Sequence, residues 1–429
     1  MKQSSHSTRF FYGWYVLTGC FFLLFFQSGA RHSFGVMFKP MISQLGWDRA
    51  SISLAFFLNM TMFALTLTIA GRLYDRYGPK WVIFISTVFM AVGYICISRI
   101  DSLWEFYLYY GVVVGIGVGG ASVPLVAALM SKWFEKRRGL TISLAICGNC
   151  VGQFVLVPLF TVFVIHYDWR ASYFIIGLII LVINTLLAFA VIKGDPRDFG
   201  LKPLGHQAQA GVKKVKDQTI PEDSPKDLGL RDAMRTHSFW LFLIAMFICG
   251  SGDFLVTAHL IPLVTDYGIS PRTAGNMLAW FGLMSMGGIL FAGPVSDWIG
   301  NKTPIALSFF LRICVYILIL NYQNLISFYV FAMVFGFTFL ITAPLTATLA
   351  GRLYGFGHVG LLSGFITTVH HFGGGFWAYI GGLLFDKTGS YRLIFISSAI
   401  LALIALLCTI FIKEKRHLKE VPKIKSAYL

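Results

Sequence analysis

The sequence GRLYDRYGPK occupies residues 71–80, and a second version of it, GPVSDWIGNK, occupies residues 293–302. The two stretches keep two glycines, an aspartate and a lysine in register, as Gly71 and Gly293, Asp75 and Asp297, Gly78 and Gly300, and Lys80 and Lys302. Two further pairs of segments repeat at almost the same separation, 139–152 with 360–373 and 28–29 with 251–252. Three anchors with nearly one separation indicate an internal duplication, so the two halves of the chain are expected to share a fold.

The composition places this duplicated fold in a membrane. Of the 429 residues 56% are hydrophobic and 13% are charged, and the mean hydropathy is +0.72. Apolar runs predict twelve spanning helices, at about residues 11–38, 50–71, 81–99, 104–130, 139–164, 171–192, 239–264, 273–296, 303–320, 325–350, 360–385 and 391–412. The predicted fold class is an all-α membrane protein with twelve transmembrane helices in two pseudo-symmetric six-helix bundles.

A polar stretch between the halves defines the predicted domains. Residues 1–193 are expected to form the N-terminal bundle, residues 194–237 a cytoplasmic linker, and residues 238–429 the C-terminal bundle with a cytoplasmic tail. Repeats of this kind are the usual build of transporters, with the substrate site at the interface between the repeats.

The distribution of charge predicts the orientation. Most of the 35 Lys and Arg residues fall on one side when both termini are placed in the cytoplasm, so we expect a multi-pass protein of the cell inner membrane. This asymmetry explains the net charge of +16 through contact with the lipid bilayer and without nucleic acid. The first span is expected to be a retained helix and not a signal peptide. The seven cysteines lie in apolar spans and are expected to be reduced packing residues, with no metal site at Cys147 and Cys150.

GRLYDRYGPK resembles the loop between helices two and three of the major facilitator superfamily, G-x-L-x-D-R-x-G-R-K, and only Pro79 departs from that pattern. The resemblance covers essentially the whole chain and implies the twelve-helix major facilitator fold. It also implies a cytoplasmic conformational latch that holds the outward-open state. The residues that match it are Gly71, Asp75, Arg76 and Lys80, with Asp297 in the second copy.

WFEKRRGLTISLAICGNCVG, at residues 133–152, resembles the fifth-helix signature of the monocarboxylate transporter family, a family of organic-anion carriers. YGWYV at residues 12–16 resembles the start of helix one in the same family, and the oxalate/formate antiporters are a more distant resemblance. Gly148 and Gly152 are expected to form a small-residue face that allows close helix contact. The sequence departs from these families in helix eight, where residues 277–296 carry no charge. That departure removes the expected substrate arginine and calls for another cation.

The stretch FFQSGARHSFGVMF, at residues 25–38, supplies a cation near the end of the apolar first span. A guanidinium inside a span costs roughly 2.5 kcal/mol or more, so Arg31 is expected either to contact an anion or to snorkel to the headgroups. His32 is the adjacent candidate for substrate binding. The repeat places Asp253 of the seventh span one position from Arg31, which predicts an ion pair between Arg31 and Asp253 across the halves.

Histidines and amides complete the set of candidate residues. His370 and His371 lie near the middle of the eleventh span, and Asn149 and Gln153 lie at the matching place in the fifth, so all four are candidates for substrate binding. Asp253 and His259 are the candidates for proton coupling, since carboxyl and imidazole groups exchange protons where arginine does not. Buried pairing to backbone or threonine groups remains the alternative for His370 and His371. Arg312 in the ninth span is expected to snorkel or to serve the structure.

These residues predict a secondary active transporter of a small organic anion. The favoured function is proton-coupled monocarboxylate symport by alternating access, with Arg31 binding the carboxylate and Asp253 or a histidine taking the proton. An organic-anion exchanger of the oxalate/formate type and an exporter of hydrophobic compounds remain alternatives. Nothing in the sequence resembles a nucleotide site or a nucleophile with its base, so we expect no enzyme activity, no cofactor and no metal. The carrier is expected to function as a monomer.

Overall fold

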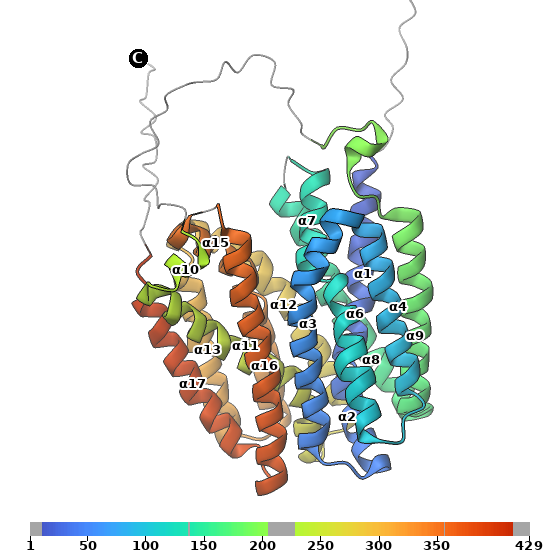
Figure 1. Ribbon diagram of the computed structural model, residues 1–429. Helices are drawn as coiled ribbons and strands as arrows, with labels where there is room; N and C mark the ends of the chain where they lie inside the picture. The colour runs from blue at the N-terminus through green and yellow to red at the C-terminus, as the bar shows by residue number, and fades with distance from the viewer. Residues whose placement is uncertain (1–10, 136–137, 205–227, 356, 415–429) are drawn as a thin grey trace, which may run out of the picture.

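The structure, a computed structural model, describes residues 11–135, 138–204, 228–355 and 357–414. Most of the described residues are helical, and the long helices run roughly side by side (Figure 1). Helices of the first half of the chain lie on one side of the molecule and most helices of the second half on the other. The predicted all-α membrane fold with two helical bundles is thereby confirmed.

The first half contains six predicted spans, and three of them, the first, the fourth and the sixth, are divided into shorter pieces. The first span breaks at Ser33, and the fourth includes a π-helical segment and a turn near Ala121. In chain order the helices are α1 (Gly13–His32), α2 (Phe34–Leu45), α3 (Arg49–Tyr77), α4 (Pro79–Ile97), α5 (Leu103–Phe106), the π-helix η1 (Tyr107–Val114), α6 (Gly115–Gly120), α7 (Val123–Trp133), α8 (Arg138–His166), α9 (Trp169–Leu186) and the π-helix η2 (Leu187–Val191).

The second half repeats this order after a short connection. The predicted linker lies largely outside the described residues, so its boundaries at 194 and 237 stay a prediction. The helices are the 3-10 helix η3 (Pro196–Phe199), α10 (Leu230–Ala233), α11 (His237–Asp266), α12 (Pro271–Ile299), α13 (Lys302–Asn321), α14 (Leu325–Phe339), α15 (Thr342–Tyr354), α16 (Val359–Thr388) and α17 (Arg392–Phe411).

Eleven stretches of the described chain are helical, long and apolar enough to cross a membrane. The remaining predicted span corresponds to α16, which has 30 residues and is long enough to cross at 1.5 Å per residue. It contains several glycines and two histidines, which lower its apolar character. Helix α16 packs along α11 of its own half and along α3 of the other half, and its two histidines are partly buried there.

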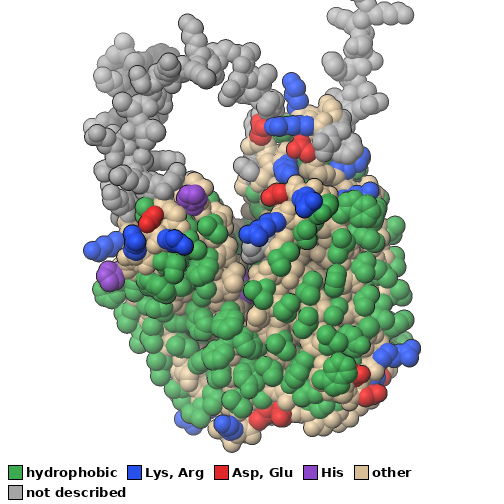
Figure 2. All heavy atoms as spheres, viewed as in Figure 1, with side chains coloured by type: hydrophobic (Ala, Val, Ile, Leu, Met, Phe, Trp, Pro, Cys, Tyr) green, Lys and Arg blue, Asp and Glu red, His purple; other side chains and the backbone are tan. Residues whose placement is uncertain are grey.

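The surface agrees with a membrane-spanning orientation. Figure 2 shows a broad zone of hydrophobic side chains around the middle of the molecule, with Lys, Arg, Asp and Glu gathered toward its two ends. We call the end where α1 begins and α17 finishes the tail end, and the opposite end, where α3 begins, the far end (Figure 1). The cysteines in the described chain are all free, as predicted.

Glycines allow the closest helix contacts in the first half. A Cβ atom on Gly148 or Gly152 of α8 would overlap the backbone carbonyls of Phe21 and Phe25 on α1. The small-residue face predicted in the fifth span is therefore confirmed, and α1 is its partner. This contact fixes α1, the helix that carries Arg31, against α8.

Replacing Gly152 with valine is expected to lower the free energy of unfolding by about 1–3 kcal/mol, because the added side chain must displace backbone and not a flexible side chain. Thermal unfolding of the purified protein measures this change. Gly139→Val on the same helix is the control, because a Cβ there meets nothing within 4 Å. Equal losses of stability for the two variants would contradict the assigned contact.

The two halves touch closely in the middle of the molecule and toward the far end. A Cβ on Gly382 of α16 would lie 2.7 Å from the Arg49 carbonyl oxygen of α3, and a Cβ on Gly282 of α12 would lie 2.9 Å from the Gln153 side chain of α8. Glycines near the tail end of these helices meet nothing within 4 Å, at Gly71, Gly139, Gly293 and Gly360. Figure 2 shows a cleft between the two lobes at the tail end. The structure is closed at the far end and open at the tail end.

Candidate functional site

Arg31 lies near the end of α1, partly buried, between aromatic rings from both halves. The Cζ atom of its guanidinium is 5.0 Å from the ring centroid of Phe63 on α3 and 5.2 Å from that of Phe254 on α11. Its Nη2 atom lies 3.0 Å from the sulfur of Met60. Within the described residues no carboxylate forms an ion pair with it. A guanidinium has five N–H donors, so most of the hydrogen-bonding capacity of Arg31 remains for a ligand.

His32, next to Arg31, is buried and bonded within its own helix. Its Nδ1 atom lies 2.9 Å from the carbonyl oxygen of Ser28 and 3.1 Å from the hydroxyl oxygen of Ser28. Because a carbonyl oxygen accepts, the Nδ1 atom carries the proton and donates it. The structure therefore gives the Nδ1 atom of His32 a partner in its own helix, and substrate binding by His32 stays a prediction.

His371 lies beside the aromatic rings that flank Arg31. Its ring centroid is 4.6 Å from that of Phe63 and 5.3 Å from that of Phe254. The Nδ1 atom is 2.8 Å from the carbonyl oxygen of Thr367 and must donate to it. The Nε2 atom has no hydrogen-bond partner among the described residues. His371 therefore offers a ring nitrogen beside the candidate anion site.

His370 connects the rings beside Arg31 with Asp253. The ring centroids of His370 and His371 are 5.2 Å apart. The Nδ1 atom of His370 donates to the carbonyl oxygen of Met246 at 3.2 Å, which leaves Nε2 to face Asp253. The Nε2 atom lies 3.6 Å from the Oδ2 atom of Asp253, a separation that suits an ion pair if the imidazole is protonated.

Asp253 is fully buried in α11 and pairs with Arg312 of α13, whose Nη2 atom is 2.6 Å from the Oδ1 atom of the carboxylate. The predicted pair between Arg31 and Asp253 is therefore wrong in this conformation. The two residues lie at similar depth, but their side chains leave their helices in different directions. Arg31 meets Phe254, the neighbour of Asp253, while the carboxylate itself turns toward α13.

Of the two roles expected for Arg312, the structure excludes snorkelling, because only 2% of its side chain is exposed, and it agrees with a structural role. Its Nε and Nη2 atoms donate to the hydroxyl and the carbonyl oxygen of Thr338 at 3.0 and 3.1 Å, and Nη1 donates to the carbonyl oxygen of Cys249 at 3.2 Å. The guanidinium also stacks near the ring of Phe335. Arg312 was recognisable as the one charge in its apolar span, since a lone intramembrane charge calls for a partner of opposite sign.

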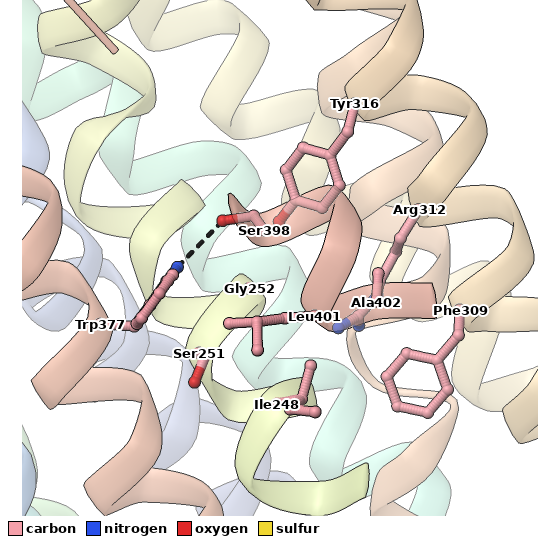
Figure 3. Close-up of a pocket in the computed structure, with 10 residues that line it drawn as sticks. All are labelled: Ile248, Ser251, Gly252, Phe309, Arg312, Tyr316, Trp377, Ser398, Leu401 and Ala402. Carbon is pink, nitrogen blue, oxygen red and sulfur yellow. Dashed lines mark hydrogen bonds between the residues drawn. The ribbon is translucent and has the colours of Figure 1, made fainter. Parts of the chain in front are cut away.

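A small cavity borders Arg312. Its volume is about 10 Å³, close to the least that holds one water molecule. Figure 3 shows Arg312 and Tyr316 of α13 with Ser398 of α17 around it, and the indole nitrogen of Trp377 donates to Ser398 at 2.9 Å. The buried charges of the second half thus have polar surroundings within a largely apolar bundle.

Cys249, Asp253 and His370 have potential metal-ligating atoms within 4.8 Å of one another, the one such group in the described chain. Asp253 already forms an ion pair with Arg312, whose guanidinium also contacts the carbonyl oxygen and the sulfur of Cys249. A divalent cation would therefore meet a fixed positive charge at this place. The ion pair of Asp253 and Arg312, with His370 beside it, therefore suits the uptake of a proton better than the binding of a metal ion.

The two amide candidates occupy different surroundings. Gln153 is buried and donates from Nε2 to the carbonyl oxygen of Leu278 on α12 at 3.0 Å, so it joins the two halves. Asn149, one turn earlier on α8, is partly exposed and has no hydrogen-bond partner among the described residues. Asn149 is therefore the better placed of the two to meet a ligand.

His259 lies apart from Asp253, in a network near the far end. Its Nε2 atom donates to the carbonyl oxygen of Ala378 at 2.9 Å, and its Nδ1 atom accepts from the hydroxyl of Tyr391 at 2.9 Å. The Ser53 hydroxyl of α3 lies 3.3 Å from the same Nε2 atom. These bonds join α3, α11 and α16, so the position of His259 suits closure of the far end.

Charged residues extend this network, which we call the far-end lock, across the two halves. Arg49 of α3 makes two hydrogen bonds to the carboxylate of Asp266 at 2.8 and 2.9 Å, and donates to the Tyr391 hydroxyl at 2.7 Å. Lys39 of α2 pairs with the same carboxylate at 2.6 Å. Asp386 of α16 accepts from the first backbone N–H groups of α3. The first half thus supplies the cations and the second half the anions.

The predicted latch lies at the tail end, where the halves are apart. Asp75 and Arg76 are exposed, and Asp75 has no ion pair among the described residues. Lys80 lies 4.4 Å from the ring centroid of Phe189 within its own half. Gly71 meets nothing, and the side chain of Asp297 lies outside the described part of the structure. Among the described residues, the candidate latch residues of the first half make no ion pair with the second half in this conformation.

Comparison with known families places the fold. The model of the Major Facilitator Superfamily matches residues 20–264 and again residues 241–427, so together the two matches cover nearly the whole chain. The chain is 14% identical to a bacterial homologue of the human lysosomal transporter Spinster, solved in an inward-facing and occupied conformation. That comparison covers 94% of this chain and 97% of the other with a TM-score of 0.73, which establishes likeness of fold.

Curated relatives include three carriers of differing description. An uncharacterized MFS-type transporter, YcxA of Bacillus subtilis, is 27% identical over 89% of this chain and 90% of its own length. Monocarboxylate transporter 13 of Bos taurus is 24% identical over 90% of this chain and 85% of its own length. The oxalate:formate antiporter of Oxalobacter formigenes is 24% identical over 69% of this chain and 66% of its own length.

Proposed function

The chain belongs to the Major Facilitator Superfamily of transporters, and from that premise we propose that it carries a monocarboxylate across the membrane together with a proton. Arg31 is the observation that supports this proposal most directly. It is a partly buried cation at the junction of the halves, it has no carboxylate partner in the described chain, and most of its donors are unused. A bound carboxylate would supply the missing negative charge and accept two parallel N–H bonds.

The proton is proposed to bind at Asp253, with His370 as the adjacent acceptor. Asp253 and Arg312 neutralise each other, and the Nε2 atom of His370 faces the carboxylate at 3.6 Å. A proton added there keeps the net charge of carrier plus ligand unchanged when an anion binds at Arg31. This balance matters because an uncompensated charge enclosed in the bundle is costly. His371 lies between the two places and suits the transfer of a proton between them.

The two ends are proposed to open in turn. The described conformation is closed by the far-end lock and open at the tail end, and the candidate latch at Asp75 would close the tail end in the other state. The distribution of Lys and Arg supports a cytoplasmic tail end, with both termini inside and the protein in the inner membrane. The halves that move are proposed to be residues 1–193 and 238–429, joined by the linker 194–237, within one functional monomer.

Replacing Arg31 with glutamine is expected to reduce pH-driven carboxylate uptake at least tenfold, since a charged hydrogen bond contributes roughly 1.5–3 kcal/mol. Uptake is measured in proteoliposomes with an imposed pH gradient and a panel of monocarboxylates. Arg272→Gln, an exposed arginine at the far end, is the matched control. Unchanged uptake of every carboxylate by the Arg31 variant would overturn the proposal. Uptake that ignores the pH gradient but needs an anion inside the vesicle would favour exchange, the activity in the name of the oxalate:formate relative.

A further inference from the structure

We infer that the carried anion is a monocarboxylate with an apolar aromatic body, in preference to a short hydroxy acid or a dicarboxylate. This inference rests on the proposed function and refines the chemistry of the same site. It follows from what surrounds Arg31. Both rings near its guanidinium are phenylalanines, Phe63 and Phe254, and the nearest sulfur belongs to Met60. A carboxylate held by Arg31 therefore projects its body against rings and a thioether.

The apolar wall continues beyond the first two rings. Phe254 packs against Phe56 and Phe339, with ring centroids 6.2 and 6.4 Å apart, and the imidazole of His371 bridges Phe63 and Phe254. These rings come from α3, α11, α14 and α16, so both halves contribute to the wall. Aromatic side chains prefer edge-to-face or offset contacts with another ring, and an aromatic ligand would complete such a set.

Three hydroxyl groups near this wall are already engaged. The Ser28 hydroxyl contacts His32, the Thr61 hydroxyl donates to the carbonyl oxygen of Phe57, and the Thr257 hydroxyl donates to that of Phe254. A hydroxyl or keto group on the ligand would lose its water without gaining a partner from these residues, which disfavours binding. On the side of the site that these residues line, an apolar ligand body is therefore favoured over a small polar acid.

The charges near the site also select for a single carboxylate. Arg312 is the other buried guanidinium near α11 in the described chain, and Asp253 already neutralises it. A second carboxylate on the ligand would find no free cation beside Phe254, because the charge of Arg312 is already paired with Asp253 and His370 offers a positive charge only when it is protonated. A dicarboxylate would thus bring one charge more than the site can pair.

A ligand panel tests the inference on the intact purified protein. Phenylacetate, lactate, oxalate and phenylacetamide are titrated at one pH, and the dissociation constant of each is taken from the rise in unfolding temperature. We expect phenylacetate to bind at least tenfold more tightly than lactate or oxalate, and phenylacetamide to bind no more tightly than lactate. Phe63→Leu should narrow the preference for phenylacetate over lactate several-fold. Phe106→Leu, which removes a buried ring away from Arg31, is the control and should leave the preference unchanged.

The outcomes separate this inference from the function it rests on. If lactate or oxalate binds as tightly as phenylacetate and Arg31→Gln weakens them all, the aromatic preference is wrong and carboxylate transport stands. If phenylacetamide binds as tightly as phenylacetate, the carboxylate is not recognised and both proposals fail. Failure of all four compounds to bind also overturns both. If Phe63→Leu does not fold, the preference of the unaltered protein still decides the question.

Discussion

Replacing Arg312 with glutamine is expected to lower the free energy of unfolding by roughly 3–5 kcal/mol, the cost of leaving a buried charge without its partner. Asp253 is fully buried, and its Oδ1 atom has the Arg312 guanidinium at 2.6 Å. The same guanidinium also bonds Thr338 and Cys249, so its loss leaves several buried acceptors unpaired. The measurement is unfolding of the purified protein in detergent by heat and by denaturant.

The double variant Arg312→Gln with Asp253→Asn tests whether the two charges are energetically coupled. Removing both charges eliminates the uncompensated carboxylate, so it should recover most of the stability that Arg312→Gln alone loses. Additive losses from the two single variants would show that the pair is not coupled. Transport separates the structural role from the functional one. Asp253→Asn should retain carboxylate exchange and lose accumulation driven by a pH gradient, because an amide cannot take up the coupled proton.

Replacing Arg49 with glutamine is expected to shift the conformational equilibrium toward a state open at the far end by about 2 kcal/mol, or roughly 30-fold in the population ratio. Arg49 bonds Asp266 and Tyr391 of the other half, and its guanidinium lies 3.6 Å from the ring centroid of Phe385. Only 11% of its side chain is exposed, so water and salt weaken these bonds less than those of a surface pair. The lock is made only when the far end is closed, so removing it affects one state alone.

Spin-label distances measure this shift. One pair of labels, at Tyr167 and Tyr322, reports the far end, and another, at Tyr77 and Trp298, reports the tail end, since all four side chains are exposed. On a background without native cysteines, the far-end distance should grow in Arg49→Gln while the tail-end distance shrinks. Arg170→Gln is the control, because Arg170 pairs with Asp101 at the far end within one half. Distances that match the control would contradict the assigned lock.

Sequence patterns predicted the helices and their packing faces better than they predicted which charged and polar side chains bind each other. The apolar runs and the repeat of residues 71–80 at 293–302 required only local properties of the chain, as did the small-residue face at Gly148 and Gly152. The pairing of Asp253 was missed because a repeat fixes depth along a helix and leaves direction around it open. Each residue turns the side chain by about 100°, so a shift of one position points to a different neighbour.

His259 and Arg49 show the other limit of the sequence. Their partners, Tyr391 and Asp266, lie more than a hundred positions away in the chain, and no spacing rule connects them. The pair of Arg312 and Asp253 could have been predicted from the sequence, because the two residues are lone charges of opposite sign in two apolar spans. Pairing such charges by sign would have found the bond, whereas matching by depth alone paired Asp253 with Arg31.

The start of α3 has a property that follows from its capping. The backbone N–H groups of Arg49 and Ala50 donate to the carboxylate of Asp386, which belongs to the other half of the protein. Those amides lack partners in their own helix, as the first N–H groups of any helix do. Their hydrogens are therefore protected from exchange with solvent deuterium only while the far end is closed. Deuterium uptake at these two backbone amides therefore reports opening of the far end in the protein without any substitution.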